Sequence, residues 1–441
     1  MENILKHFIH TKKYPMLLMT LLILSIFLLS FSRATSTFIS VPFQANQEIN
    51  LEITYNVNYQ ALSPYNSIFK IWIPRLKTWN SEDINQTAAV QTVNQLDIIP
   101  PDFYQKYSFD PSDVYGNSYD YYELEMKPMY DQTTFSYSAI YNVALQSRNW
   151  SIPMDLSLND YNKSDSIYEF YTSPQPYYEI NDTEVQTLAS SITHNSTNIK
   201  KILESVYLFV EDSMNYTAMD EVLSLKEIIG NYQGDCSEFS TLMVGLLRTA
   251  GIPARKVLGI SLIEGSLSEP IPKYDMRPGD QWSYSLESEN VIPGHAWVQY
   301  YVPYLGWVSA DPTWGKPYYA YGNESALQYL YQIDYLHLIT TIGGWYEYDI
   351  NPPLEILEVN STGIPEFPFL FPIGNAQNYQ LDFQIDFEVL SSTYVSGLYL
   401  DQNSWIILII TSSSFLIIVF LCFGSLYSRR HKRRNTNFFR N

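Results

Sequence analysis

The sequence predicts an α+β protein: an N-terminal antiparallel β-sandwich-like domain, then an α+β core, then a C-terminal transmembrane helix. Three observations lead to this fold class. Residues 37–175 alternate apolar and polar side chains with the period of two that strands require. From about residue 183 apolar residues recur at the helical period, and strand patterns return after 255. Residues 405–427 carry no charge and are long enough to cross a bilayer as a helix.

These patterns divide the 441 residues into six segments. They are a cytoplasmic tail with a signal peptide or signal anchor (1–34), an extracytoplasmic β-domain (35–178), a second domain with an α+β fold (179–348), a Pro-rich strand and stalk segment (349–404), the transmembrane helix (405–427) and a basic cytoplasmic tail (428–441).

The two apolar segments also predict the topology. Residues 16–31 follow a lysine-containing tail, as in a secretory signal, and the sequence leaves open whether this segment is cleaved. Five basic residues lie between 429 and 434, directly after the second segment. Because positive charge flanks the cytoplasmic ends of membrane segments, we expect the bulk of the chain outside the cytoplasm and the C-terminus inside.

The charge balance is strongly acidic, with 46 acidic against 26 basic residues and a net charge of −20. Ten of the basic residues lie in the two predicted tails, so the outer part is more acidic still. This argues against nucleic acid as a partner, because phosphates need a basic surface. Eight glycosylation sequons also lie on the predicted outer side, at Asn85, Asn149, Asn162, Asn181, Asn195, Asn215, Asn323 and Asn360.

The β-region should contain strands at 51–59, 69–73 and 135–141, where the alternation is clearest. The segment 110–130, rich in Tyr, Asp, Ser and Gly, is predicted to be a long loop. Helices are expected from Asp182 and at 199–214, because polar capping residues precede apolar positions three and four apart.

A third helix is predicted to start beside Cys236, with Asp235 as its N-cap. The dipole at a helix N-terminus favours a thiolate, and the N–H groups there suit an oxyanion; Tyr232 or Gln233 are further candidate donors. The nearby carboxylates of Asp235 and Glu238 oppose a thiolate unless they are turned away. The chain's other cysteine, Cys422, lies in the predicted membrane segment, so Cys236 has no disulfide partner in the outer part.

His295 and Asp311 lie on two consecutive predicted strands, 295–302 and 306–311. A five-residue hairpin loop at 301–305 would place them directly opposite each other, which suits a hydrogen bond between imidazole and carboxylate. The order Cys236, His295, Asp311 therefore fits nucleophile, base and orienting acid. We interpret His194 and His337 as structural residues.

Four blocks of sequence carry a resemblance to a known family. They are Gly-Asp-Cys-Ser-Glu-Phe-Ser-Thr-Leu from 234, Leu-Arg-Thr-Ala-Gly-Ile-Pro-Ala-Arg from 247, His-Ala-Trp-Val from 295 and Gly-Trp-Val-Ser-Ala-Asp-Pro-Thr from 306. Together they resemble the core of the transglutaminase-like superfamily, and most of all its microbial exported branch. The resemblance covers about residues 180–345. It implies a papain-like triad in which Cys236 is the nucleophile, His295 the base and acid, and Asp311 the orienting residue.

The resemblance leaves the reaction open, because the family includes cross-linking enzymes, cysteine peptidases, amidases and inactive relatives. The calcium sites of the animal enzymes, and their tryptophan upstream of the cysteine, have no clear counterpart here. We expect a thiol enzyme that needs no cofactor or metal and hydrolyses peptide or amide bonds of proteins at the cell surface. Acyl transfer and a catalytically silent adhesion or scaffold ectodomain are the alternatives, and the oligomeric state stays open.

Overall fold

The computed structural model describes residues 43–393, apart from 62–66, 80–88, 103, 105, 111–114, 127–133, 220–221, 265–270, 274, 287–290, 316–326, 344–370 and 374–378. Phe43–Tyr399 is one compact unit. The two segments predicted to meet the membrane, 16–31 and 405–427, lie outside the described residues. Within the described part, no helix is both long enough and apolar enough to span a membrane.

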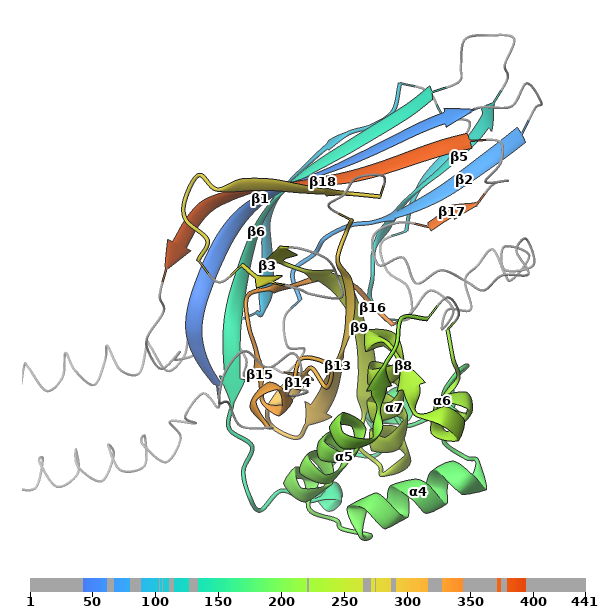
Figure 1. The fold of residues 1–441 in the computed structure, drawn as a ribbon, viewed down its shortest axis with the longest axis vertical. Coiled ribbons are helices and arrows are strands. Elements are labelled where there is room, and N and C mark those ends of the chain that lie inside the picture. Colours follow the sequence, from blue (N-terminus) through green and yellow to red (C-terminus); the bar gives the residue numbers. More distant parts are fainter. Residues whose placement is uncertain are drawn as a thin grey trace, which may run out of the picture. The chain divides into compact units, whose positions relative to one another are not determined.

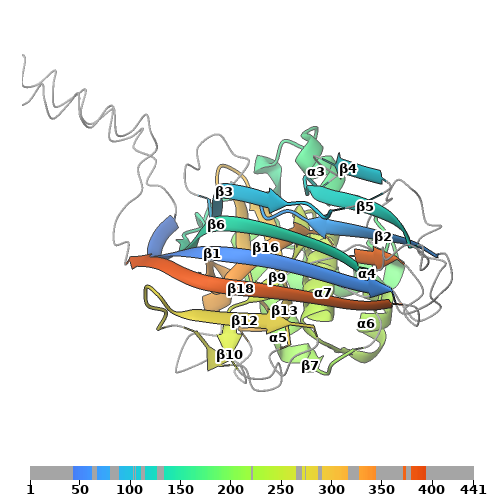
Figure 2. The same ribbon diagram turned by 90° about the horizontal axis from the view of Figure 1, so that it is seen from above.

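The largest sheet has six strands, with the order β12-β18-β1-β6-β15 and with β3 also paired to β6. Figure 2 shows β3, β6, β1, β18 and β12 lying side by side. The strands are β1 (Phe43–Ala61), β3 (Gln91–Ile99), β6 (Thr134–Trp150), β12 (Gln281–Ser285), β15 (Gln332–Ile333) and β18 (Tyr379–Thr393). β1 and β6 contain the predicted strands 51–59 and 135–141, and their alternating apolar residues are buried.

A second sheet has the order β17-β2-β5-β4, and its strands are β2 (Ser67–Pro74), β4 (Lys106–Asp110), β5 (Tyr119–Met126) and β17 (Phe371–Ile373). The two sheets touch through aromatic rings, because Tyr122 of β5 packs on Phe135 and Tyr137 of β6. The prediction of a long loop at 110–130 was wrong, since β5 occupies 119–126. Its polar-looking tyrosines act as core residues there, and Tyr122 is only 2% exposed.

The last described strand completes the large sheet. β18 pairs with nearly the whole of β1, from Ala61 opposite Tyr379 to Glu48 opposite Thr393. The segment 349–404, predicted as a short strand pair and stalk, therefore supplies a central 15-residue strand. β12 and β15, which come from the predicted second domain, join the same sheet. Chain-order domains and sheet membership thus do not coincide in this protein.

The helices gather on one side of the large sheet and lie below it in Figure 1. Its helices are α3 (Ser166–Tyr171), α4 (Thr183–Thr193), α5 (Ile199–Ser213), α6 (Leu225–Asn231) and α7 (Cys236–Thr249). α4, α5 and α7 match the three predicted helices, and Asp182 and Asp235 cap α4 and α7 as predicted. Short 3₁₀ turns occur at Leu158–Asp160 and Gln328–Leu330.

A four-stranded antiparallel sheet in the order β14-β13-β9-β16 supports the helices. Its strands are β9 (Ala254–Ser261), β13 (Gly294–Val302), β14 (Gly306–Ala310) and β16 (His337–Ile342), and two small ladders pair β7 (Asn215–Tyr216) with β8 (Gln233–Gly234) and β10 (Ile263–Glu264) with β11 (Ile271–Pro272). α7 packs against β13 and β9. The α+β core that the sequence predicts is thus present, as a mixed core of helices and sheet.

Side chains from the β-region fasten β16 to the rest of the unit. The amide of Gln91 donates to the carbonyl of Ile339 and accepts from its N–H, at 2.9 and 2.8 Å. Asn117 makes the same pair of bonds to Ile342, at 2.8 and 2.7 Å. The β-region therefore holds the edge of the sheet that carries the candidate site.

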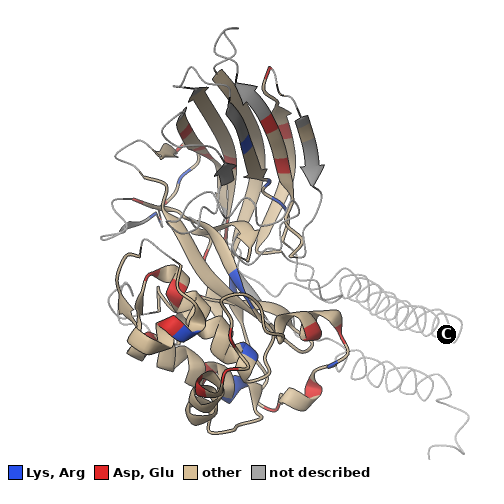
Figure 3. Ribbon diagram, turned by 90° about the vertical axis from the view of Figure 1, so that its right-hand side faces the viewer, with Lys and Arg blue, Asp and Glu red and all other residues tan. Residues whose placement is uncertain are grey.

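Described acidic residues occur on both the strands and the helices (Figure 3).

Candidate active site

Cys236 is the first residue of α7, and this residue is only partly buried. The rest of α7 is anchored by an almost entirely buried apolar face, which includes Phe239, Leu242, Met243, Leu246 and Leu247. The helix ends at Thr249, and Gly251 follows with a φ of 87°, a conformation that glycine adopts without strain. The sequence therefore places a thiol at the open end of a rigid, buried helix.

The two carboxylates beside the thiol are turned back onto the helix backbone. Asp235 accepts a hydrogen bond from the N–H of Ser237 at 2.9 Å, and Glu238 accepts one from the N–H of Asp235 at 3.0 Å. This reciprocal capping box uses their negative charge to stabilise the helix start. Gly234 is needed for it, because a Cβ there would lie 2.2 Å from the side chain of Glu238.

A buried lysine supports the same turn. Lys256 of β9 is fully buried and donates from Nζ to the hydroxyl of Ser237 at 2.8 Å. This contact ties the residue next to the thiol to the sheet below it. The predicted oxyanion candidates lie just upstream: Tyr232 ends α6 with a φ of 51°, and Gln233 is exposed in β8.

His295 and Asp311 are brought together. Nε2 of His295 lies 2.7 Å from Oδ2 of Asp311, and both residues are buried. Because Nε2 is occupied by the carboxylate, Nδ1 is the ring nitrogen that remains for a thiol. The pairing of Cys236 with His295 stays a prediction, but the helix that carries Cys236 packs on the strand that carries His295.

The register that brings this pair together differs from the predicted one. β13 and β14 pair with Val302 opposite Gly306 and Val298 opposite Ala310, so the loop has three residues, 303–305, and not five. His295 and Asp311 are therefore diagonal neighbours rather than directly opposite. A shift of two positions keeps side chains on the same face of a sheet, and diagonal neighbours remain within reach of long side chains.

His337, interpreted from the sequence as structural, lies in this cluster. It begins β16, its Nε2 is 3.1 Å from Oδ2 of Asp311, and its Nδ1 is 2.6 Å from Oδ1 of Asp334. Sequence reasoning missed both His337 and Asp334. The available signal was an Asp three residues before a His at the start of an apolar strand, where a charged pair would have to be buried.

The charges of the cluster are strongly coupled. Burial would raise the pKa of the Asp311 carboxyl, but the charges and hydrogen bonds of His295 and His337 hold that pKa well below its usual range. Burial would lower the pKa of His337, yet the charges and hydrogen bonds of Asp334 and Asp311 raise it to about 9. At neutral pH Asp311 is therefore a carboxylate and His337 an imidazolium.

Two tryptophans enclose the imidazole rings. Trp297 stacks on His295 with 5.8 Å between ring centroids, and Trp314 lies 5.7 Å from His295 and 4.7 Å from His337. Gly259 of β9 makes room for Trp297, because a Cβ there would lie 2.5 Å from the indole ring. Trp297 thus forms a wall of the site.

Ligand atoms of His295, Asp311 and His337 lie within 4.8 Å of one another, a spacing that metal sites also show. Here the same atoms contact each other at hydrogen-bond distance, 2.7 and 3.1 Å. A metal ion would need Nε2 lone pairs directed at a common centre and not N–H groups directed at the carboxylate. We therefore assign the cluster to hydrogen bonding.

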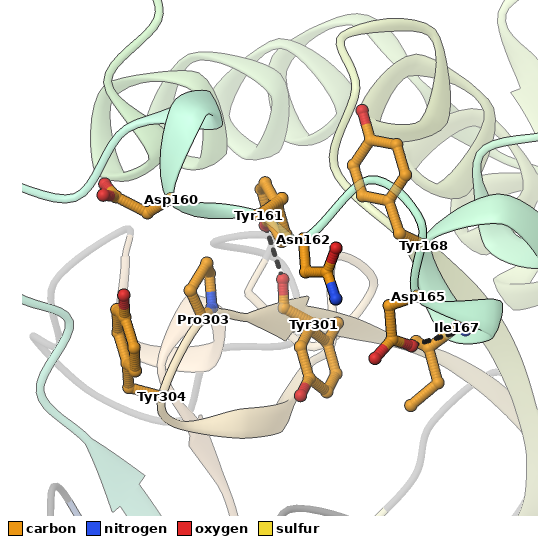
Figure 4. A pocket seen from close by; sticks show the side chains of 9 residues that line it. All are labelled: Asp160, Tyr161, Asn162, Asp165, Ile167, Tyr168, Tyr301, Pro303 and Tyr304. Carbon is orange, nitrogen blue, oxygen red and sulfur yellow. Dashed lines mark hydrogen bonds between the residues drawn. The ribbon is translucent and has the colours of Figure 1, made fainter.

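The opposite end of β13 holds a separate open pocket of about 220 Å³. Tyr301, Pro303 and Tyr304 line it from the β13–β14 hairpin, and Asp160, Tyr161, Asn162, Asp165, Ile167 and Tyr168 line it from the segment around α3 (Figure 4). Six residues of strand, about 20 Å, separate Tyr301 from His295. The pocket is therefore not part of the His–Asp cluster.

The sequence model of the transglutaminase-like superfamily matches residues 186–312, a segment that includes Cys236, His295 and Asp311. The chain carries a transglutaminase-like domain. Two curated proteins are similar to part of this chain. The uncharacterized protein YebA of Bacillus subtilis (strain 168) is 33% identical over 158 residues, which is 33% of this chain and 20% of YebA. A protein-glutamine gamma-glutamyltransferase of Pseudomonas aeruginosa is 35% identical over 81 residues, which is 18% of this chain and 10% of that protein.

Solved structures similar to this chain are more distant in sequence. A candidate cysteine protease from Cytophaga hutchinsonii is 15% identical, with a TM-score of 0.48, over 81% of this chain and 96% of that one. The periplasmic domain of TgpA from Pseudomonas aeruginosa is 16% identical, with a TM-score of 0.30, over 60% of this chain and 91% of that one. The superfamily match ends before Asp334 and His337, so these residues lie outside the matched segment.

Proposed function

We propose that this chain is a thiol enzyme, held at the membrane and facing outward, in which Cys236 forms a thioester with an acyl group and water releases it. The observation that carries the proposal is the buried 2.7 Å bond between His295 and Asp311 on the sheet that supports the Cys236 helix. An imidazole oriented by a carboxylate is what a nucleophilic thiol needs nearby. The outward location rests on the charge and apolar patterns of the two ends of the sequence.

In the proposed reaction Nδ1 of His295 takes the thiol proton, and the Cys236 sulfur attacks the carbonyl carbon of a peptide or carboxamide. The tetrahedral intermediate collapses as His295 returns the proton to the departing amine, which leaves the thioester. His295 then takes a proton from water, whose oxygen attacks the thioester and releases a carboxylic acid and the thiol. Asp311 keeps the imidazole in the required tautomer throughout.

Hydrolysis is the first choice because Cys236 is partly exposed, and water outnumbers any amine at an open site. Acyl transfer to an amine is the second candidate. It is favoured by the similarity to the Pseudomonas protein-glutamine gamma-glutamyltransferase, although that similarity spans only a tenth of the relative. Proteins or peptides at the cell surface are the proposed substrates of either reaction.

Labelling of the full chain with a thiol-directed acyl probe tests the proposal. We expect Cys236→Ala to abolish labelling and His295→Gln to reduce it by at least about 100-fold, the scale of a lost general base. Cys422→Ala is the matched control and should label like the wild type. Equal labelling of Cys236→Ala and wild type would contradict an enzymatic role and favour a silent scaffold.

The two reactions are separated by their products. A glutamine-containing peptide is incubated with the full chain, with and without an added primary amine. Release of ammonia with formation of glutamate, unchanged by the amine, supports hydrolysis. Incorporation of the amine that exceeds release of acid would replace hydrolysis by acyl transfer.

A further inference from the structure

We propose that Asp334 and His337 extend the His295–Asp311 pair into a buried relay, Asp334–His337–Asp311–His295, in which His337 is a positioning residue. The functional effect of the relay rests on the proposed function, because His295 affects the reaction only if it serves the thiol of Cys236. Its geometry is independent of that function. The four side chains come from β13, the turn after β14, the turn before β16 and β16 itself.

The contacts of His337 define its protonation state. Both of its ring nitrogens face carboxylate oxygens, Nδ1 at 2.6 Å from Asp334 and Nε2 at 3.1 Å from Asp311. A neutral imidazole has only one N–H, so two ionised acceptors require the doubly protonated ring. The pKa of about 9 that its surroundings give His337 agrees with this. Among the described residues, the titratable groups around its ring are Asp334, Asp311, His295 and Tyr329.

The outer carboxylate is itself held in place. Asp334 accepts hydrogen bonds from the hydroxyl of Tyr329 at 2.9 Å and from the N–H of Leu336 at 3.0 Å. It is 8% exposed, so its charge is little screened by water. Asp334 is therefore a fixed, buried anion whose cost is offset by the His337 imidazolium.

The carboxylate of Asp311, the inner of the two, has hydrogen-bond partners at all of its acceptor positions. Oδ1 of Asp311 accepts from the N–H groups of Thr313 and Trp314 at 2.8 and 3.0 Å, while Oδ2 faces His295 and His337. A carboxylate has about four lone-pair positions, and all four are used here. Asp311 cannot rotate without breaking several bonds, so Oδ2 stays directed at His295.

His337 also changes what Asp311 does to His295. An unshared carboxylate would strongly favour a proton on the neighbouring imidazole. A cation that shares the same oxygen, 5.7 Å from His295 between ring centroids, offsets part of that field. The relay thereby weakens the field that Asp311 alone would exert at His295, and it fixes the carboxylate that orients this ring.

The pH profile of alkylation by iodoacetate, measured on the full chain carrying Cys422→Ala, tests the relay. Iodoacetate is an anion and reacts with a thiolate that is paired with an imidazolium. The fall of the alkylation rate at high pH, which is the alkaline limb of the profile, therefore reports loss of the imidazolium proton. We expect His337→Gln to shift the alkaline limb to higher pH, by about 1–2 pH units. Asp334→Asn should move it upward by less, because it removes a more distant charge. His194→Gln, at an exposed helix end, should leave it unchanged. An alkaline limb that stays in place or moves downward in folded His337→Gln would overturn the relay.

A second measurement reads the relay without relying on Cys236 or on a variant that must fold. In wild-type protein with ¹⁵N-labelled histidine, His337 should show protons on both ring nitrogens at neutral pH. A single ring N–H on His337 would overturn the relay. Failure of the proposed function looks different: the profile of His295→Gln would then match that of the wild type, whatever the state of His337.

Discussion

The two ends of β13 combine aromatic rings and carboxylates in opposite ways. At the His295 end, Asp311 is fully buried and bonded to two imidazoles. At the hairpin end, the carboxylates of Asp160 and Asp165 are exposed and cap their own turns, and Tyr304 is 70% exposed. The difference teaches that residue type alone does not make a site. Burial and the identity of the hydrogen-bond partner decide whether a carboxylate can tune another group's chemistry.

The largest expected difference between the two ends comes from removing one carboxylate charge at each. Asp311→Asn should lower the rate of Cys236 acylation by about 10³–10⁴-fold, because the amide favours the wrong imidazole tautomer. It should also lower the free energy of unfolding by about 3–5 kcal/mol, since buried His337 loses a counter-charge.

Asp165→Asn is the matched control, and it should change the free energy of unfolding by less than about 0.5 kcal/mol because asparagine also caps helices. Probe labelling and urea denaturation measure the two effects. Similar losses at both ends would contradict the comparison.

The next effect is the pH dependence of stability. The folded pKa of His337, about 9, exceeds the unfolded value of 6.5, so its contribution is complete below pH 6.5 and is lost as pH rises through 9. The loss should reach roughly 3 kcal/mol. Asp311 acts in the opposite range: its pKa is depressed, so its contribution is lost as pH falls below its ordinary value.

Urea denaturation at a series of pH values measures the alkaline loss. The dependence should be flatter in His337→Gln than in the wild type, because that variant has no imidazolium to titrate. An equal alkaline loss in both proteins would assign it to another group.

The smallest effect belongs to the hairpin end. Tyr304 has a φ of 67°, which costs a residue with a Cβ about 1 kcal/mol relative to glycine. Tyr304→Gly should therefore raise the free energy of unfolding by about 0.5–1 kcal/mol and leave the labelling of Cys236 unchanged. Thermal denaturation and probe labelling check both parts. A change in labelling would show that the two ends of β13 are coupled.

Local patterns accounted for much of the fold. The strands at 51–59 and 135–141, the three helices and the caps Asp182 and Asp235 depend on neighbours a few residues away, and each was found as predicted. The prediction of a long loop at 110–130 was wrong because the tyrosines there look polar in the sequence, whereas those of β5 are buried. The predicted hairpin register was wrong because loop length depends on backbone conformation, here positive φ values at Tyr304 and Gly306.

The sequence by itself determined the chemical groups: a thiol at a helix start, a histidine at the start of one strand and an aspartate at the end of the next. These are local relations, so period and capping reveal them. Only the tertiary structure decided that His337 and Asp334 join them. β16 reaches β13 only through its pairing with β9, a contact between segments far apart in the chain. Such pairing is set by the packing of the whole sheet, and no local pattern in the sequence encodes it.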